Sequence, residues 1–324
     1  MRLIDRWVGI PLCFFASFWP LKKAQADSNS TLATNIPPPD TIVFIGIAEI
    51  GALVVAYPAI KETRKQHPKS RICFITAPAG LQTLELMGFE KEDIFLLETS
   101  SIKSLLKGIV NIRSHFKGKR VSAIVLEPFT RFSTLLSAWI GASKRIGCYR
   151  FLNEGVYLGN ILTHRLVYNP HLHMSQTYFA LAKALIEPDS AKPLLKEYIP
   201  SQIKNRLKIN IPEKERQTLM KRLQSECPEN PLKKIILLNA NTSDIVPLRK
   251  WPLENFVELG KQLLENSEFT VVLTGSPEEK DVCVDLALQI NPDRTVNFAG
   301  KTSFKELITL YSISDLLITN DSGP

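Results

Sequence analysis

The sequence predicts an α/β fold in which helices cover parallel strands. Short β-branched runs alternate with helical patterns along most of the chain, and the runs of the second half end in glycine or polar residues. Hydrophobic residues make up 44% of the chain and charged residues 22%, which is typical of a globular protein. At 324 residues the chain exceeds the size at which one hydrophobic core keeps growing. We therefore expect two α/β domains.

The expected strands form two series. The first, in residues 41–187, contains "TIVFIG", "RICFITA", "DIFLLE" and "VSAIVLE", and the second, in residues 233–324, contains "KKIILLNA", "FTVVLTG", "RTVNFAG" and "DLLITND". Apolar residues at helical spacing predict helices near 253–264 and 304–311, the latter opened by a capping box of Ser303 and Glu306. Residues 188–232 are expected to connect the domains and to include a surface helix in "PEKERQTLMKRLQSE".

Residues 1–21 form an apolar segment of a different kind. They carry no charge from 7 to 21, and basic residues stand on both sides of this run. At about 1.5 Å per residue the run is too short to cross a hydrocarbon core of about 30 Å, and Trp7 and Trp19 suit the headgroup region. We expect it to lie in the interface of an anionic membrane; a secretory signal peptide and an unordered leader are the alternatives. The proline-rich residues 22–40 are expected to be a linker.

Charge and cysteine usage limit the classes of function. Forty Lys and Arg against 32 Asp and Glu give a net charge of +8, which favours anionic partners. The basic residues are dispersed, so no nucleic-acid partner is expected. Five scattered cysteines without a CxxC pair argue against a zinc ribbon or a disulfide scaffold. No HExxH metal motif and no GxSxG elbow occurs, and "GIAEIG" fits neither a dinucleotide fingerprint nor a Walker loop.

Polar residues after the strands of the second series indicate a diphosphate site. "NANTSDIVPLRKWP" follows the first of these strands with Thr242, Ser243, Arg249 and Lys250. Hydroxyls and cations in one loop can hold a diphosphate, although a solvated basic loop is the alternative. "LTGSPEEKD" places Glu278 and Glu279 at the start of a helix, where carboxylates usually serve the helix dipole and less often bind a ribose. The final "LLITNDSGP" presents Asp321, Ser322 and Gly323, whose backbone N–H groups would bind an anion if a helix followed.

These segments together carry a resemblance to a known family. The order "LNANTS...RKWP", "VVLTGSPEE" and "NFAGKTSFKELITLYSISDLLITNDSGP" resembles the carboxyl-terminal domain of glycosyltransferase family 9, the lipopolysaccharide heptosyltransferases. "FIGIAEIGALVVAYPAIKETRKQHPKSRICFIT" is similar to the family's opening strand, glycine loop and first helix, and "TRFSTLLSAWIGASKRIGCY" to its mid-domain helix and strand. The resemblance implies a GT-B architecture of two Rossmann-like doubly wound domains, the second incomplete here because the family continues past Pro324.

The resemblance also implies site residues. The "DSGP"-type loop and a basic residue before "WP" would hold the donor diphosphate, which maps onto Asp321, Ser322 and Gly323 and onto Arg249 or Lys250; Thr242 and Ser243 would contribute hydroxyls, and Glu279 would bind the ribose. The acceptor-side loop would contain Gly46 and Gly51. The family usually follows this second glycine with Asp, its proposed general base, but Ala52 stands here. Glu49 is the nearest carboxylate in the loop and therefore the expected base.

We thus expect an inverting, metal-independent glycosyltransferase without a cofactor, peripheral on the cytoplasmic face of the inner membrane. Its donor would be a nucleotide sugar, ADP-heptose by resemblance, and its acceptor the lipopolysaccharide core or another lipid-linked saccharide. Two alternatives remain open: a non-catalytic nucleotide-sugar-binding member of the family, and a member that uses a UDP- or GDP-sugar. A chain that ends at Pro324 is expected to bind its donor poorly.

Overall fold

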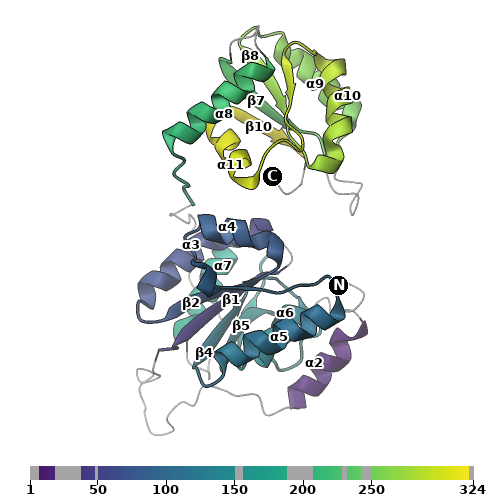
Figure 1. The fold of residues 1–324 in the computed structure, drawn as a ribbon. Coiled ribbons are helices and arrows are strands. Elements are labelled where there is room, and N and C mark those ends of the chain that lie inside the picture. The colour runs from purple at the N-terminus through teal and green to yellow at the C-terminus, as the bar shows by residue number, and fades with distance from the viewer. Residues whose placement is uncertain are drawn as a thin grey trace. The chain divides into compact units, whose positions relative to one another are not determined.

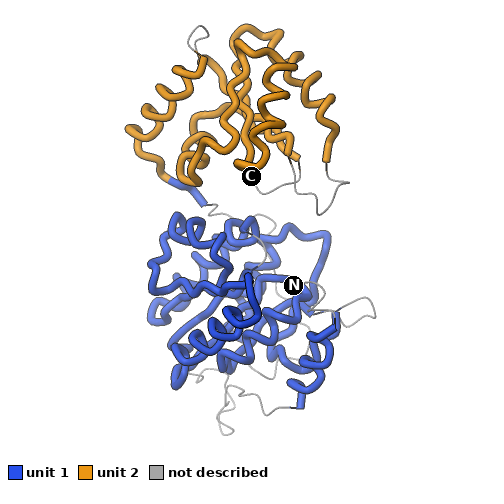
Figure 2. The backbone as a smooth tube through the Cα atoms, turned by 45° about the vertical axis from the view of Figure 1, so that its right-hand side comes forward, with its two compact units in different colours: residues 1–209 blue, residues 210–324 orange. Residues whose placement is uncertain are grey.

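The computed structural model describes residues 7–18, 38–47, 50–149, 156–187, 207–227, 232–241 and 250–320. The chain divides into two compact units, residues 1–209 and residues 210–324 (Figure 2). Each unit contains its own parallel sheet, so the predicted α/β class is confirmed. The division falls inside the stretch expected to connect the domains. Helix α8 (Glu213–Glu226), predicted as a surface helix of that connection, is part of the second unit.

Unit 1 is built on a six-stranded sheet in the order β3-β2-β1-β4-β5-β6, with every neighbouring pair parallel. The strands are β1 (Thr41–Ile45), β2 (Arg71–Thr76), β3 (Ile94–Leu96), β4 (Val121–Val125), β5 (Lys144–Tyr149) and β6 (His164–Val167). The first four match the predicted runs, and β5 lies in the segment that resembles the family's mid-domain strand. Strand β6 was not predicted, because only two of its four residues are apolar.

Helices cover both faces of this sheet (Figure 1). They are α3 (Ile50–Gln66), α4 (Leu81–Leu86), α5 (Ile102–Phe116), α6 (Arg131–Trp139) and α7 (Met174–Lys183). Side chains of α3, α4 and α7 share one hydrophobic core with the sheet, and side chains of α5 and α6 share the other. The amino-terminal helix α2 (Gly9–Phe18) packs on α6. Both faces of the sheet are therefore covered, as the continuous apolar runs of its strands require.

Unit 2 has a four-stranded parallel sheet in the order β10-β7-β8-β9. Its strands are β7 (Lys234–Asn239), β8 (Phe269–Leu273), β9 (Thr295–Asn297) and β10 (Leu316–Thr319), all in predicted runs. Helices α9 (Leu253–Leu264) and α10 (Lys280–Ile290) pack on one face of the sheet, and α8 and α11 (Phe304–Ile313) on the other. The predicted helices near 253–264 and 304–311 are confirmed.

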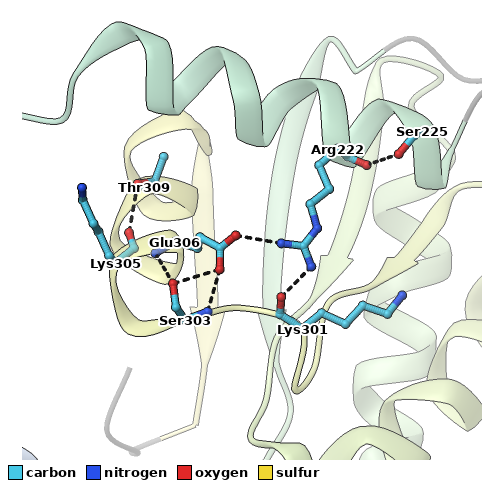
Figure 3. Close-up of polar contacts among 7 residues, drawn as sticks. All are labelled: Arg222, Ser225, Lys301, Ser303, Lys305, Glu306 and Thr309. Carbon is cyan, nitrogen blue, oxygen red and sulfur yellow. Dashed lines mark hydrogen bonds and ion pairs between the residues drawn. The ribbon is translucent and has the colours of Figure 1, made fainter.

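The guanidinium of Arg222 links helix α8 to the rest of unit 2 (Figure 3). One nitrogen donates to Glu306 Oε1 at 2.8 Å, another donates to the carbonyl of Lys301 at 2.6 Å, and the group lies 5.2 Å from the centre of the Phe298 ring. Glu306 also completes the predicted capping box, since its Oε2 accepts the Ser303 N–H at 2.8 Å while Ser303 Oγ accepts the Glu306 N–H at 3.2 Å. The side chain of Lys301 also pairs with Glu226 at the end of α8, with 2.8 Å between nitrogen and oxygen.

Both sheets contain a point at which the strand order reverses. In unit 1 the chain builds outward from β1 to β3 and then returns to form β4 on the other side of β1. In unit 2 it builds from β7 to β9 and returns to form β10 beside β7. Ligands of open parallel sheets bind outside the carboxyl ends of the strands at such reversals. The ends of β1 and β4, and those of β7 and β10, are therefore where a site is expected.

Candidate functional site

At the reversal in unit 1, a buried carboxylate joins the segments that follow β1 and β4. Glu127 comes two residues after β4, and its Oε1 accepts the backbone N–H of Ile47 at 2.8 Å. Its Oε2 accepts a hydrogen bond from the hydroxyl of Ser133 in α6. The residue is only 8% exposed. Glu127 therefore fixes the backbone of the β1–α3 loop immediately before Ala48 and Glu49.

Of the residues expected in the acceptor-side loop, Gly46 directly follows β1, but Gly51 belongs to helix α3 and not to the loop. Glu49, the expected base, lies outside the described residues. Gly46 is buried directly after β1, and a Cβ there would stand 3.1 Å from Leu53 Cδ2, so this glycine lets α3 pack closely on the strand. Gly51 lies in the first turn of α3 with open space around its Cα. Only Gly46 has a visible steric reason to be glycine.

The segment after β4 is strained. Phe129 has a φ of 61°, a conformation that costs a bulky side chain free energy. Its ring packs edge-on against Tyr168, with 5.4 Å between the ring centres, and this packing helps to hold the conformation. A buried carboxylate and a strained residue thus lie two positions apart at the carboxyl edge of the sheet. Neither residue was predicted to have a role, although "VSAIVLE" shows that a carboxylate ends the run.

At the reversal in unit 2, an asparagine joins the segments that follow β7 and β10. Asn320 Oδ1 accepts the backbone N–H of Trp251 at 3.1 Å, and its Nδ2 donates to the Ala240 carbonyl at 2.7 Å. On the other side of β7, Asn239 Nδ2 donates to Thr274 Oγ1 at 3.3 Å. The ends of β7, β8 and β10 are therefore linked by side-chain amides.

This arrangement brings the residue that follows Lys250 to the end of β10. Lys250, an exposed cation, directly precedes Trp251, and Asn320 directly precedes Asp321. The hydrogen bond between Trp251 and Asn320 thus connects the "RKWP" segment to the start of the "DSGP" segment. Trp251 in turn packs edge-on against Phe256 of α9, with 4.9 Å between the ring centres. The remaining expected donor residues, Thr242, Ser243, Arg249, Asp321, Ser322 and Gly323, lie outside the described residues.

Glu279 ends the short helical turn Pro277–Glu279, which follows the neighbouring strand β8. Its Oε2 accepts the Ser276 N–H at 2.7 Å, so this carboxylate has a local capping role, which was not predicted from the sequence. A Cβ on Gly275 would lie 3.0 Å from that oxygen and 3.0 Å from Asn241 Nδ2, so Gly275 allows the two polar groups to approach each other. Asn241 also donates to the buried sulfur of Cys283, at 3.4 Å. Glu279 and Asn241 therefore flank one small space at the strand ends.

The match to a protein family decides the classification. Residues 122–324, well over half of the chain, match the profile of glycosyltransferase family 9 (heptosyltransferase). The chain belongs to glycosyltransferase family 9.

Two curated relatives match over a shorter stretch. Over 80 residues the chain is 31% identical to lipopolysaccharide heptosyltransferase 2 of Salmonella typhimurium and 30% identical to that of Escherichia coli strain K12. Each alignment covers 24% of this chain and 23% of the relative, so it spans about a quarter of the length of these curated relatives.

Solved structures of the family share the fold. The family 9 glycosyltransferase of Veillonella parvula matches with a TM-score of 0.65 at 20% identity, over 89% of this chain and 76% of the other. The E. coli ADP-heptose lipopolysaccharide heptosyltransferase II matches with a TM-score of 0.63 at 19% identity, over 87% and 80%. E. coli heptosyltransferase WaaC with ADP-2-deoxy-2-fluoro heptose matches with a TM-score of 0.61 at 13% identity, over 87% and 83%. The two units of this family 9 chain thus have the α/β architecture of GT-B heptosyltransferases.

Proposed function

We propose that this family 9 protein transfers a sugar from a nucleotide diphosphate sugar, with ADP-heptose as donor and the lipopolysaccharide core as acceptor. The observation that carries the proposal is the neighbourhood at the reversal of unit 2. There the Trp251–Asn320 hydrogen bond joins the segment that holds the exposed cation Lys250 to the segment that continues into Asp321. A cation, backbone N–H groups and strand ends are what diphosphate binding requires. Heptose is proposed as the transferred sugar because both curated relatives are lipopolysaccharide heptosyltransferases.

In the proposed reaction the acceptor hydroxyl oxygen attacks the anomeric carbon from the side opposite the diphosphate. The new C–O bond forms as the bond to the diphosphate oxygen breaks, and the nucleotide diphosphate leaves with that electron pair. The acceptor proton passes to the carboxylate of Glu49, and the configuration at the anomeric carbon inverts. Glu127 is a positioning residue in this proposal, because it holds the backbone of the loop that contains Glu49.

Donor-side roles follow from the same chemistry. Arg249 and Lys250 would neutralise the diphosphate, Thr242 and Ser243 would donate hydroxyl hydrogen bonds to it, and residues 321–323 would offer backbone N–H groups. Glu279 has one oxygen committed to its cap, and its other oxygen can accept from a ribose hydroxyl. The acceptor would be presented at the cytoplasmic face of the inner membrane. Across the described residues, no helix combines the length and the hydropathy needed to span a bilayer.

The test is calorimetry with ADP, UDP and GDP, followed by transfer of labelled heptose from ADP-heptose to a lipid-linked core acceptor. We expect ADP to bind more tightly than UDP and GDP and label to appear in the acceptor. Preference for UDP or GDP would assign the protein to another donor. Failure to bind any of the three, both by this chain and by a version extended past Pro324 as in the family, would refute the proposed site.

A second candidate function is donor binding without transfer. The observation that favours it is Ala52, whose methyl group stands where the family usually has the Asp proposed as base. In that case ADP would bind in the calorimeter, yet no label would reach the acceptor.

A further inference from the structure

Helix α2 is docked on unit 1 by a polar contact and a row of small residues. Ser17 Oγ accepts the backbone N–H of Asn160 at 2.9 Å and donates to the Cys13 carbonyl at 2.7 Å. Cys13 is completely buried. Gly9, Cys13 and Ser17 are spaced four residues apart, so they lie on one face of the helix. That face is turned toward unit 1.

The fit of this face is close at both ends. A Cβ on Gly9 would stand 2.9 Å from Arg131 Cδ, at the start of α6. Near the other end, Gly159 has a φ of +59°, and a Cβ there would lie 2.0 Å from Ser17 Oγ and 2.7 Å from the Cys13 carbonyl oxygen. A helix held this closely to its neighbour is part of the folded unit, unlike a flexible leader.

The outer side of α2 is apolar and exposed. Residues 7–18 contain no charged side chain. Phe15 is 68% exposed and Phe18 is 73% exposed. The other large apolar side chains exposed on this segment are Trp7, Val8, Ile10, Leu12 and Phe14. Monomeric proteins rarely expose so contiguous an apolar surface unless it contacts a partner or a membrane.

Helix α5 exposes a second apolar row. Ile102, Leu106 and Val110 are all exposed and recur every four residues on one side of the helix. Helix α6 contacts both α2 and α5, and its exposed Trp139 lies 5.9 Å from the guanidinium of Arg113 on α5. Exposed apolar side chains of three contacting helices therefore occur in one region of unit 1.

The charged side chains of α5 and of the turn that follows it are all basic. From residue 102 to residue 120 the chain has six Lys and Arg and no Asp or Glu. These cations are Lys103, Lys107, Arg113, Lys117, Lys119 and Arg120. Arg120 forms an ion pair with Asp40, with 2.6 Å between nitrogen and oxygen, and within the described part of the chain the other five cations form none. Further basic residues stand on both sides of the apolar run in the sequence, at Arg6 and at Lys22.

We propose that α2 and the exposed row of α5, together the docking surface, bind an anionic lipid bilayer. Ten helical residues extend about 15 Å, half of a hydrocarbon core, so α2 lies along the interface with its outer side among the acyl chains. The cations of α5 contact the anionic headgroups. A second copy of the chain is disfavoured as the occupant, because it would bring cations against cations. This inference does not depend on the proposed sugar transfer.

The docking surface fixes the orientation of unit 1 on the membrane. An apolar leader on a flexible linker would also bring the protein to the membrane, but in any orientation. Because α2 is fixed to α6 and the exposed row of α5 joins the contact, unit 1 binds in one orientation. Both helices then contribute to binding, and removal of either contribution weakens it.

The test is flotation of the full chain with vesicles of phosphatidylcholine and phosphatidylglycerol, and with phosphatidylcholine alone. We expect flotation with the anionic vesicles that weakens at high salt, and little with the neutral ones. The double variant Phe15→Glu/Phe18→Glu and the double variant Leu106→Glu/Val110→Glu should each lower the bound fraction about tenfold or more. The control is Leu288→Glu on α10, an exposed leucine of unit 2 that should float as the wild type does.

Folding of each variant is checked by its circular dichroism spectrum and by the protection of Cys13 from a thiol reagent, which reports that α2 is still docked. Wild-type protein that stays unbound with anionic vesicles would overturn the proposal. Unchanged flotation of the α5 variant would overturn the shared surface. A dimer in sedimentation that the α2 variant dissociates, without flotation of the wild type, would show that a second copy covers this surface.

Discussion

The carboxylate of Glu127 accepts the backbone N–H of Ile47, a residue 80 positions earlier in the chain, at 2.8 Å. The contact crosses the reversal of the unit 1 sheet, and it lies two residues before the expected base. Among the described residues, Ile47 and Ser133 both donate to this buried carboxylate. Its removal should therefore affect both the stability of unit 1 and the placement of the loop.

We expect Glu127→Ala to lower the free energy of unfolding by about 2 kcal/mol, because it leaves the partly buried N–H of Ile47 and the buried hydroxyl of Ser133 without this acceptor. Turnover should fall further than the loss of folded protein explains, while the Kd for ADP stays unchanged, since the donor residues belong to unit 2. Urea unfolding and steady-state kinetics measure the two effects. Glu98→Ala, which removes an exposed carboxylate after β3, is the matched control and should change neither.

Glu49→Gln keeps the shape of the side chain and removes its basicity. If Glu49 is the base, kcat should fall about 10²- to 10⁴-fold with little change in donor affinity. Transfer of labelled sugar and calorimetry with ADP provide the two readouts. A kcat within about threefold of the wild-type value would show that another group takes the proton.

The double variant Arg249→Ala/Lys250→Ala removes the two cations that precede Trp251. We expect the Kd for ADP to rise more than about tenfold, or about 1.4 kcal/mol, because charge-assisted contacts to phosphate are typically worth that or more. Calorimetry at fixed salt measures the change. The control Lys261→Ala removes another exposed cation of unit 2, on α9, and should leave the Kd for ADP unchanged. If both variants raised the Kd equally, the net positive charge of the unit, and not a specific site, would explain ADP binding.

Glu306 makes the stability of unit 2 sensitive to acid. Hydrogen bonds from the Ser303 N–H and hydroxyl, and then the nearby Arg222, hold the pKa of Glu306 below its ordinary value of 4.5. A carboxylate with a lowered pKa stabilises the fold above its unfolded-state pKa, and this contribution disappears as the pH falls through the folded-state pKa.

Glu306→Gln can keep the capping hydrogen bonds but loses the charge. It should cost about 1 kcal/mol or less at neutral pH, because the side chain is 42% exposed and water screens the pair with Arg222. The difference from the wild type should shrink as the pH falls below the ordinary pKa of 4.5 and disappear below the lowered pKa of the folded state. Urea unfolding at a series of pH values measures both curves, and a constant offset down to low pH would exclude the charge as the cause.

Buried thiols give a direct measure of α2 docking. All five cysteines are buried, and burial raises the pKa of Cys73 and of Cys148 to about 12. The folded protein should therefore react slowly with a thiol reagent at about pH 8. Gly159→Ala would force a methyl group into Ser17 and should release α2, so that Cys13 reacts rapidly.

Two controls accompany this experiment. Gly118 also has a positive φ, +81°, but beyond its chain neighbours no atom lies within 4 Å of the position that a Cβ would take. Gly118→Ala thus introduces backbone strain without a clash and should leave Cys13 protected. Cys13→Ser combined with Gly159→Ala should remove the rapid phase. A rapid phase that persists in this combination would come from another thiol and would contradict the docking of α2 through Gly159.

The sequence predicts the strands of this protein better than its contacts. Strands such as β1 and β7 are found because their apolar runs are buried on both faces and end in polar or glycine residues. Strand β6 is missed because "HRLV" is too short and too polar to stand out. Helix α8 is predicted, but not its place in unit 2, since only Leu219 and Leu223 of this helix are buried.

In the candidate site, too, local features can be predicted from the sequence but long-range contacts cannot. Glu279 at a helix start follows from local spacing, although its hydrogen bond to Ser276 was not predicted. The roles of Glu127 and Asn320 depend on partners 80 and 69 residues away, and these partners come into reach only once the strand order is known. The packed face of α2 is visible in the sequence as the four-residue spacing of Gly9, Cys13 and Ser17. The contact of this face with Gly159 could not be predicted, because no local pattern connects the two segments.

The same kind of hydrogen bond joins the two segments at each strand-order reversal. In each unit the side-chain oxygen of a residue just past the fourth strand that the chain adds, Glu127 or Asn320, accepts a backbone N–H from the segment that follows the unit's central first strand. In these two contacts Ile47 and Trp251 play the same part as donors. Of the two acceptors, only Glu127 is a carboxylate, whereas Asn320 is an amide. Because an amide oxygen suffices for this contact in unit 2, the acceptor in unit 1 need not be a carboxylate, and Glu127→Gln should keep the hydrogen bond from Ile47 while it removes the acidic group.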